Sequence, residues 1–248
     1  MALVVRRQTG AMGLDDHSVL TFDVVGTCID FETGIGEALA AIAQGHGRPV
    51  LDRGAALEAF GRAEGRQQQQ TPNMPFTQML TPIYREMSLE LGLPDEADHA
   101  DALRLSVPSW PAFPDAVDAL RRLRTRFRLV ALTNSDRWGL EQMAATLQHP
   151  FHDGVTAEDV GVNKPSPRVF DYCRGRQSAH GYGLADFLHV AQSQYHDIGV
   201  AKSLGYEVCW IERRSGDHGW GATPAPSEVA TPDHHFTSLG ELVAAVGA

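Results

Sequence analysis

The amino-acid sequence predicts an α/β protein with a doubly wound, Rossmann-like parallel sheet and a small, all-helical cap inserted after the first strand. The core is predicted at residues 1–31 and 115–248, where short apolar runs alternate with helical patterns, as in parallel sheets covered on both faces. The cap is predicted at residues 32–114, where apolar residues recur at three- and four-residue spacing. An insertion at this point lies above the edge where the first strand ends, so we expect it to exclude water from a site there.

The predicted elements follow from the same patterns. The first strand is the apolar run that ends at Phe22, and further strands are expected at residues 128–132, near 155, 188–190 and 208–211. Cap helices are expected at residues 34–43, 53–69, 77–91 and 95–105. Core helices are expected at residues 116–126 and 139–147, and beginning near residues 167 and 198. Residues 213–232 are rich in Gly, Pro and Ser and predict a long loop before a last strand and helix.

Composition and charge argue against several classes of function. At 248 residues and 43% hydrophobic content, the chain is long enough to bury a full core. Its net charge of −10 argues against nucleic acid or an anionic membrane as a partner. We therefore expect a small-molecule substrate. A homodimer is compatible with this charge. The three cysteines are isolated and the histidines lack the spacing of zinc ligands, so we expect neither disulfides nor zinc.

The N-terminal segment shows no pattern typical of a signal peptide. Residues 1–17 lack an apolar run long enough for a signal peptide, and we expect them to form a flexible tail. No segment approaches the ~20 apolar residues of a membrane span. Together with the isolated cysteines, this favours a protein of the reducing cytoplasm.

Asp23 is the strongest candidate for a functional residue. It ends the apolar run of the first strand and precedes the turn-forming pair Gly26-Thr27, so it delivers a carboxylate to the carboxyl edge of the sheet. An isolated aspartate in this position would more often be a solvated residue. Three further polar clusters follow apolar runs downstream and favour a site at this edge: Thr133-Asn134, Asn163-Lys164-Pro165 and Tyr195-His196-Asp197.

Lys164 stands out because the chain contains only two lysines against nineteen arginines. The other, Lys202, fits a solvated helix face. A compact ammonium beside Asp23 would keep that carboxylate ionised and stabilise a leaving anion, and the alternative is a lysine on a surface loop. Asp197 would lie within reach of Lys164 and orient either it or the hydrolytic water, unless it only caps the following helix.

Thr133 and Asn134 follow the second strand of the core and offer a hydroxyl and an amide as neutral hydrogen-bond donors. Such donors suit a substrate carboxylate or phosphoryl oxygen next to a nucleophile. Both residue types also cap helices well, and the two roles are compatible.

These clusters resemble the haloacid dehalogenase superfamily, and the resemblance implies that Asp23 attacks the substrate and forms a covalent ester. Phosphatases of this superfamily carry a second aspartate two residues after the nucleophile, where this chain has Val25, which cannot transfer a proton. A magnesium site at Asp23 and Asp197 nevertheless stays open. Relatives that cleave phosphonates use a cap lysine, and residues 32–114 contain none.

The best resemblance is to type II 2-haloacid dehalogenases, and within them to a subgroup containing azetidine-2-carboxylate hydrolase. The motifs shared with the dehalogenases are Phe22-Asp23-x-x-Gly26-Thr27, Thr133-Asn134, Lys164-Pro165, Arg168-Val169-Phe170 and Cys209-Trp210-Ile211. Those shared with the subgroup include Glu32-Thr33-Gly34-Ile35, Trp110-Pro111-Ala112-Phe113-Pro114-Asp115 and Gly221-Ala222-Thr223. The chain departs from the dehalogenases at Val25 and Phe170, where they usually or often have tyrosine.

The resemblance also implies residues that bind the substrate: Thr27, Thr133 and Asn134 at the sheet edge. A cap arginine that holds the substrate or the leaving halide best matches Arg62, with Arg66 as a weaker match, and the alternative for both is a solvated helix surface. The loop at residues 191–194 is one residue longer than in the dehalogenases, so the polar contacts of that loop fall to Ser193 or Gln194.

The resulting hypothesis is a hydrolase that converts a small 2-substituted carboxylic acid into a 2-hydroxy acid through an aspartyl ester. It needs no metal or cofactor, because Lys164 supplies the positive charge. The leaving group is a halide or the amine of a strained ring. A magnesium-dependent phosphatase and a catalytically silent protein that binds a small acid are the remaining alternatives.

Overall fold

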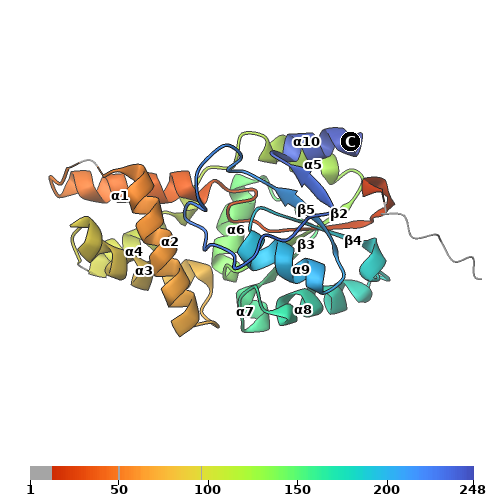
Figure 1. Cartoon of the computed structure of the whole chain (residues 1–248), viewed down its shortest axis with the longest axis horizontal. Helices are drawn as coiled ribbons and strands as arrows, with labels where there is room; N and C mark the ends of the chain where they lie inside the picture. The colour runs from red at the N-terminus through yellow and green to blue at the C-terminus, as the bar shows by residue number, and fades with distance from the viewer. Residues whose placement is uncertain (1–12, 50, 96) are drawn as a thin grey trace, which may run out of the picture.

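The computed structural model describes residues 13–49, 51–95 and 97–248 (Figure 1). In these residues the centre is a six-stranded, fully parallel sheet of order β3-β2-β1-β4-β5-β6. The strands are β1 (Val19–Phe22), β2 (Arg128–Thr133), β3 (Asp153–Thr156), β4 (Phe187–Ala191), β5 (Glu207–Ile211) and β6 (His234–Phe236). The predicted α/β core with a parallel sheet is therefore confirmed.

The register of the sheet explains why residues distant in sequence meet. Phe22, the last residue of β1, pairs with Ala131 of β2 and with Val190 of β4. The carboxyl ends of these three strands therefore lie at one edge. Strands β1 and β4 are buried along their whole length, which agrees with their almost continuous apolar sequence.

Helices cover both faces of the sheet. In Figure 1, α5 and α10 lie on one side of it, and α7, α8 and α9 lie on the other. The helices of the core are α5 (Ala116–Leu123), α6 (Arg137–Thr146), α7 (Ala157–Val160), α8 (Pro167–Ser178), α9 (Gly199–Ser203) and α10 (Leu239–Ala245). Among the described residues, no helix is both long enough and apolar enough to cross a membrane.

The segment between β1 and α5 forms a group of helices beside the carboxyl edge of the sheet, here called the helical block (Figure 1). Its members are α1 (Phe31–Gly45), α2 (Arg53–Gln70), α3 (Phe76–Leu91) and α4 (Ala97–Leu105). Helix α1 begins three residues before its predicted start, because Asp30 caps it by accepting a hydrogen bond from the Thr33 amide at 3.0 Å. The fourth helix was predicted to start at residue 95, which is not helical; residue 96 lies outside the described residues, and α4 is described from Ala97.

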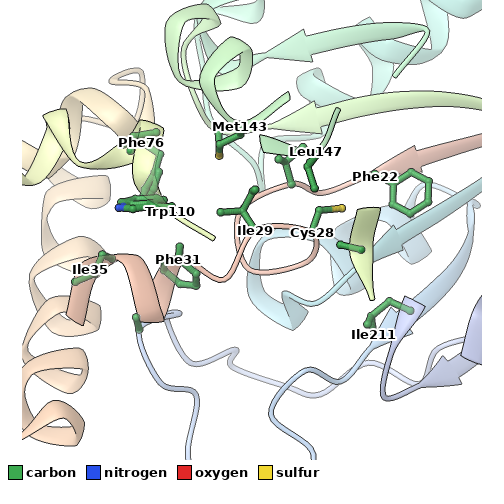
Figure 2. Packing of buried hydrophobic residues seen from close by; sticks show 14 of the residues in the cluster. Phe22, Cys28, Ile29, Phe31, Ile35, Phe76, Trp110, Met143, Leu147 and Ile211 are labelled. Atoms are coloured by element: carbon green, nitrogen blue, oxygen red, sulfur yellow. The ribbon is translucent and has the colours of Figure 1, made fainter. Parts of the chain in front are cut away.

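The chain passes between the core and the helical block twice, at residues 29–30 and 111–112, and these two segments lie side by side. The Asp30 amide donates to the Pro111 carbonyl at 2.8 Å, and Ile29 forms an antiparallel bridge with Ala112. Beyond them, Phe31 and Trp110 pack against one another with ring centroids 6.4 Å apart. Figure 2 shows how the apolar side chains continue from the sheet into the helical block through this region.

A glycine is required where these crossings pack. A Cβ atom on Gly34 would lie 2.2 Å from Cδ1 of Trp110, so any other residue would push the indole away. Because Trp110 packs on Phe76 of α3 as well as on Phe31 of α1, Gly34 sets how the helices approach each other.

The predicted flexible tail at residues 1–17 is wrong at its end. Residues 1–12 lie outside the described residues, but Leu14–Asp16 forms a short 3₁₀ helix. His17 is buried, with Nε2 3.0 Å from Oε2 of Glu207 at the start of β5. This contact attaches the segment to the core, and no apolar pattern in the sequence predicts it.

Candidate active site

Asp23 lies directly after β1, at the carboxyl edge of the sheet. The chain turns sharply behind it through Gly26, whose φ of 85° is in the left-handed region that glycine adopts readily. The Thr27 hydroxyl donates a hydrogen bond of 2.6 Å to Oδ2 of Asp23, and the Gln192 amide donates to the same hydroxyl at 2.8 Å. Thr27 therefore orients the Asp23 carboxylate from behind and does not line the cavity described below.

Lys164 is buried between two carboxylates. Its ammonium donates to Oδ1 of Asp23 at 2.9 Å, to Oδ1 of Asp197 at 2.7 Å and to the Leu132 carbonyl at 2.8 Å. These three bonds use all three N–H groups of the side chain. The structure thus brings together the three residues that the sequence analysis proposed as catalytic, and it excludes a surface position for Lys164, which is 1% exposed.

Asp197 is held by a histidine that was not among the predicted site residues. His189 of β4 places Nε2 2.9 Å from Oδ1 of Asp197, and its Nδ1 lies 2.9 Å from the Thr21 hydroxyl of β1. The sequence offered one indication of this role, because His189 lies within an otherwise apolar strand. The cap of the turn that contains Asp197 is Ser193, whose hydroxyl accepts from the His196 amide at 2.9 Å, so Asp197 is not itself the cap.

The charges of this cluster act on one another in a low-dielectric environment. Burial and the nearby Asp197 carboxylate raise the pKa of Asp23 above its usual value and outweigh the opposite effects of Lys164 and Thr27. Burial also acts to raise the pKa of Asp197, but Lys164 and His189 outweigh it and lower that pKa to about 2. Lys164 was expected to keep Asp23 ionised, and it does lower the pKa of Asp23, but the effect of burial is larger.

A cavity of about 40 Å³ opens in front of Asp23, between the core and the helical block. Because it is small, it admits only a compact ligand. Of the predicted residues, those that line it are Asp23, Thr133, Asn134, Lys164, Ser193 and Asp197. Val25, Phe31 and Phe76 add apolar walls, and the last two come from the helical block.

Two predicted substrate-binding residues have other contacts. Oδ1 of Asn134 accepts from the Lys164 amide at 2.6 Å, and its Nδ2 donates to the Lys164 carbonyl at 3.0 Å. Asn134 therefore fixes the backbone of Lys164, which leaves one amide N–H for a ligand. Gln194 does not line the cavity, because its amide pairs with the backbone of Ala230 at 3.1 and 3.4 Å; Gln192 lines it instead.

Arg62, which was predicted to bind the substrate, does not line the cavity of this structure. Its side chain is 48% exposed and pairs with Glu90 at 2.5 Å and, more loosely, with Glu58 at 3.9 Å. Arg66, one turn further along α2, pairs with Glu86. Residues four apart share a helix face, and this face of α2 points to solvent.

The opposite face of α2 contributes a residue that the sequence analysis missed. Glu64 is 7% exposed and lines the cavity. Burial raises its pKa to about 8. The signal in the sequence was its place among Phe60, Ala63 and Gln67, which are buried at three- and four-residue spacing.

Gln68 ties the same face of α2 to the core. Its amide nitrogen donates to the Lys164 carbonyl at 2.8 Å, and its Oε1 lies 2.9 Å from Nε2 of His196. Burial lowers the pKa of His196 to about 4, so the imidazole is neutral near pH 7. These bonds connect the helical block to two residues that line the cavity, Lys164 and His196.

The carboxylates here are a poor donor set for magnesium. Within the described residues, no group of three or more His, Cys, Asp or Glu side chains is arranged to hold a metal ion. Asp23 and Asp197 would be the ligands, but the Lys164 ammonium bridges their Oδ1 atoms and Thr27 engages the other oxygen of Asp23. A second cation would meet the charge of Lys164 and few free oxygens, so the geometry gives the cation role to lysine.

Comparison with known proteins finds a matching family model and relatives with different activities. A family model described as haloacid dehalogenase-like hydrolase matches residues 17–203. An (S)-2-haloacid dehalogenase of Pseudomonas fluorescens is 30% identical over 134 residues, which are 52% of this chain and 54% of the relative. A phosphoserine phosphatase of Thermus thermophilus is 29% identical over 165 residues, 64% of this chain and 62% of the relative. The matches to these two relatives thus span little more than half of their length.

Solved structures share the whole architecture. The L-2-haloacid dehalogenase of Xanthobacter autotrophicus with chloropropionic acid covalently bound superposes with a TM-score of 0.71, covering 94% of this chain and 99% of the other at 20% identity. At this identity the likeness concerns the fold.

Proposed function

The chain belongs to the haloacid dehalogenase-like hydrolase family, and we propose that this hydrolase displaces a leaving group from the α-carbon of a small carboxylic acid through an ester on Asp23. One observation carries the proposal. The Asp23 carboxylate lines a small cavity and is oriented by the Thr27 hydroxyl and the Lys164 ammonium, at 2.6 and 2.9 Å. A buried carboxylate held in this way is a nucleophile in a fixed position.

In the first step, an oxygen of Asp23 forms a bond to the α-carbon of the substrate while the leaving group departs with the bonding electrons. The substrate carboxylate is held by the Thr133 hydroxyl and by the remaining amide N–H of Asn134. Lys164 keeps its hydrogen bond to Asp23, which maintains the direction of attack.

In the second step, water attacks the carbonyl carbon of the Asp23 ester, the 2-hydroxy acid departs and the carboxylate is regenerated. Asp197 is the candidate for positioning that water. Its Oδ2 is buried and has no hydrogen-bond partner among the described residues, and a buried carboxylate oxygen without a partner is a natural acceptor for one water.

Two further observations bear on the type of reaction. The dehalogenase relatives act on 2-haloacids, and the Xanthobacter structure holds chloropropionic acid covalently, which supports an ester route. Val25, an apolar wall of the cavity, stands where the phosphatases of the superfamily need an acid and argues against phosphomonoesters. Turnover that survives EDTA and an absence of aryl phosphate hydrolysis are the expected results; loss on chelation and recovery with magnesium would favour a phosphatase instead.

An amine is a second candidate for the leaving group. The motifs shared with the azetidine-2-carboxylate hydrolase subgroup suggest it, and the position of Glu64 favours it. The dehalogenase alternative needs a cation for the departing halide, and Arg62 does not supply one. A panel of 2-chloropropionate enantiomers, fluoroacetate and azetidine-2-carboxylate separates these leaving groups, and turnover of any of them excludes a silent binding protein.

The ester itself is tested by following solvent oxygen. In a single turnover with enzyme in excess in oxygen-18 water, the label should enter the Asp23 side chain. The 2-hydroxy acid formed first should carry an unlabelled hydroxyl. If Asp23 instead activated water as a general base, the label would appear in the product and not in the protein, and the proposal would fail.

A further inference from the structure

The cavity contains more acid than base. Among the described residues that line it, Asp23, Glu64 and Asp197 carry carboxyl groups, and Lys164 is the only cation. All three N–H groups of Lys164 are already used within the protein. An anionic substrate therefore finds no free positive charge in this cavity, whereas a zwitterion brings its own.

Glu64 is the acid without a partner. No described residue donates a hydrogen bond to its carboxyl group or forms an ion pair with it, and its side chain is nine-tenths buried and faces the cavity. Burial alone raises its pKa to about 8. A ligand cation would be the partner that the described part of the chain does not provide.

The other charged groups near α2 in the described residues do not pair with Glu64. On α3, Glu86 and Glu90 pair with the solvent-facing arginines of α2, and Arg85 is exposed. On α1, Glu32 pairs with Arg214 of the loop that follows β5. From the core, the titratable groups that share the cavity with Glu64 are Asp23, Lys164, His196 and Asp197.

The rest of the cavity suits a small ring. Val25, Phe31 and Phe76 form apolar surfaces that can contact methylene groups, and Thr133 and Asn134 remain for the carboxylate. A compact molecule with an ammonium group beside its carboxylate matches this distribution of polar and apolar groups.

We propose that Glu64 binds the ring ammonium of a small, cyclic 2-amino acid and keeps its nitrogen protonated while Asp23 displaces it from the α-carbon. This inference rests on the displacement reaction proposed above. Without the proton, cleavage of the C–N bond would have to expel an amide anion, which is a very poor leaving group. Ring strain provides the remaining driving force.

The reaction is balanced in two steps. Binding of the ring ammonium ionises Glu64, which releases its proton to solvent. An oxygen of Asp23 then bonds to the α-carbon as the C–N bond breaks, and the nitrogen keeps both hydrogens and the electron pair as a neutral primary amine. Hydrolysis of the ester restores Asp23 and releases one proton, which the amine takes up before the amino-hydroxy acid leaves.

The test compares two ligands that differ in one ring atom. Azetidine-2-carboxylate carries a ring ammonium, whereas cyclobutanecarboxylate has the same shape and only a negative charge. Binding of both is measured by calorimetry in Asp23→Asn, which prevents turnover, with and without Glu64→Gln. Glu58→Gln is the matched control, because Glu58 lies on α2 with its side chain 73% exposed.

With Glu64 intact, the zwitterion should bind at least about tenfold more tightly than the carbocycle at pH 8, and Glu64→Gln should abolish that preference. Below pH 8, the affinity for the zwitterion should rise about tenfold per pH unit, with one proton released on binding, because Glu64 must ionise. Glu58→Gln should change neither result. A purely structural role for Glu64 would produce no proton release.

Equal affinity for the two ligands, or a preference that survives Glu64→Gln, would overturn the inference even if oxygen-18 enters Asp23. Conversely, label in the product together with a Glu64-dependent preference would reject the ester and leave the binding role of Glu64 standing. If Asp23→Asn fails to fold, the pH dependence of kcat/KM of the wild type and of Glu64→Gln for azetidine-2-carboxylate answers the same question. A rise to about pH 8 that only the wild type shows is expected.

Discussion

The ammonium nitrogen of Lys164 lies 2.9 Å from Oδ1 of Asp23, and both side chains are buried. The same ammonium lies 2.7 Å from Asp197, so one cation compensates two carboxylates. Removal of any single member of this group therefore changes the charge balance of the site.

Asp23→Asn should abolish turnover and leave the fold intact. An amide is a poor nucleophile, and loss of the covalent route should cost several powers of ten in rate. The remaining Lys164–Asp197 pair stays neutral overall, so the free energy of unfolding should change little. Single-turnover rates and circular dichroism check this. A folded variant with more than about a tenth of the wild-type rate would remove Asp23 from the role of nucleophile.

Lys164→Met should lower the free energy of unfolding by about 3–5 kcal/mol, because it leaves two buried carboxylates without their cation. The matched control is Lys202→Met, the other lysine of the chain, whose side chain is 39% exposed and pairs with Asp233. It should cost less than about 1 kcal/mol. Denaturant unfolding of both variants gives the comparison, and equal effects would contradict the buried network.

Asp197→Asn should shift the acid limb of the pH–rate profile to lower pH. Asp23 must be ionised to attack, so activity is present above its pKa and is lost as the pH falls through it. The Asp197 charge is one of the causes that raise the pKa of Asp23, and its removal also leaves Lys164 to Asp23 alone. The measurement is kcat/KM against pH below neutrality for wild type and variant. An unchanged limb would show that the two carboxylates do not titrate together.

Glu64→Gln should stabilise the protein at pH 8 but not at pH 4. The folded-state pKa of Glu64 is raised to about 8. The unfolded chain ionises near pH 4.3, so the stability of the wild type is greatest below that value and falls as the pH rises to about 8. The gain at pH 8 should be of order 2–4 kcal/mol. Unfolding by urea at both pH values measures it, with Glu58→Gln as the control that should change neither.

The predicted loss of stability caused by Glu64 at pH 8 is related to its proposed function. A carboxyl group that is buried without a partner destabilises the free protein, and such groups persist where a ligand provides the partner. If Glu64→Gln proves more stable and less able to bind a zwitterion, both results come from the same unpaired group.

Much of the fold and part of the site could be predicted from the sequence. The apolar run before Asp23 and the turn at Gly26 indicate a strand end at a parallel sheet edge, because only backbone register and local sterics are involved. The rarity of lysine singled out Lys164, and Val25 removed the phosphatase acid. The inference on Lys164 depends on residue type, and the inference on Val25 depends on the resemblance to the superfamily.

Other residues could be assigned only by the tertiary structure. Arg62 and Glu64 are two residues apart on α2, so they lie on nearly opposite faces, and helical packing decides which of them meets the cavity. His189 and His17 have partners on strands far away in sequence, Thr21 of β1 and Glu207 of β5.

The sequence by itself therefore determined the sheet, the helical insertion and the acid at the strand end, since periodicity and turn chemistry act over a few residues. The direction of the pKa shift at Asp23, the engagement of Asn134 by the backbone of Lys164 and the unpaired state of Glu64 were decided by the tertiary structure alone. Burial and electrostatic interactions depend on distances through space, and those distances exist only once the chain has folded.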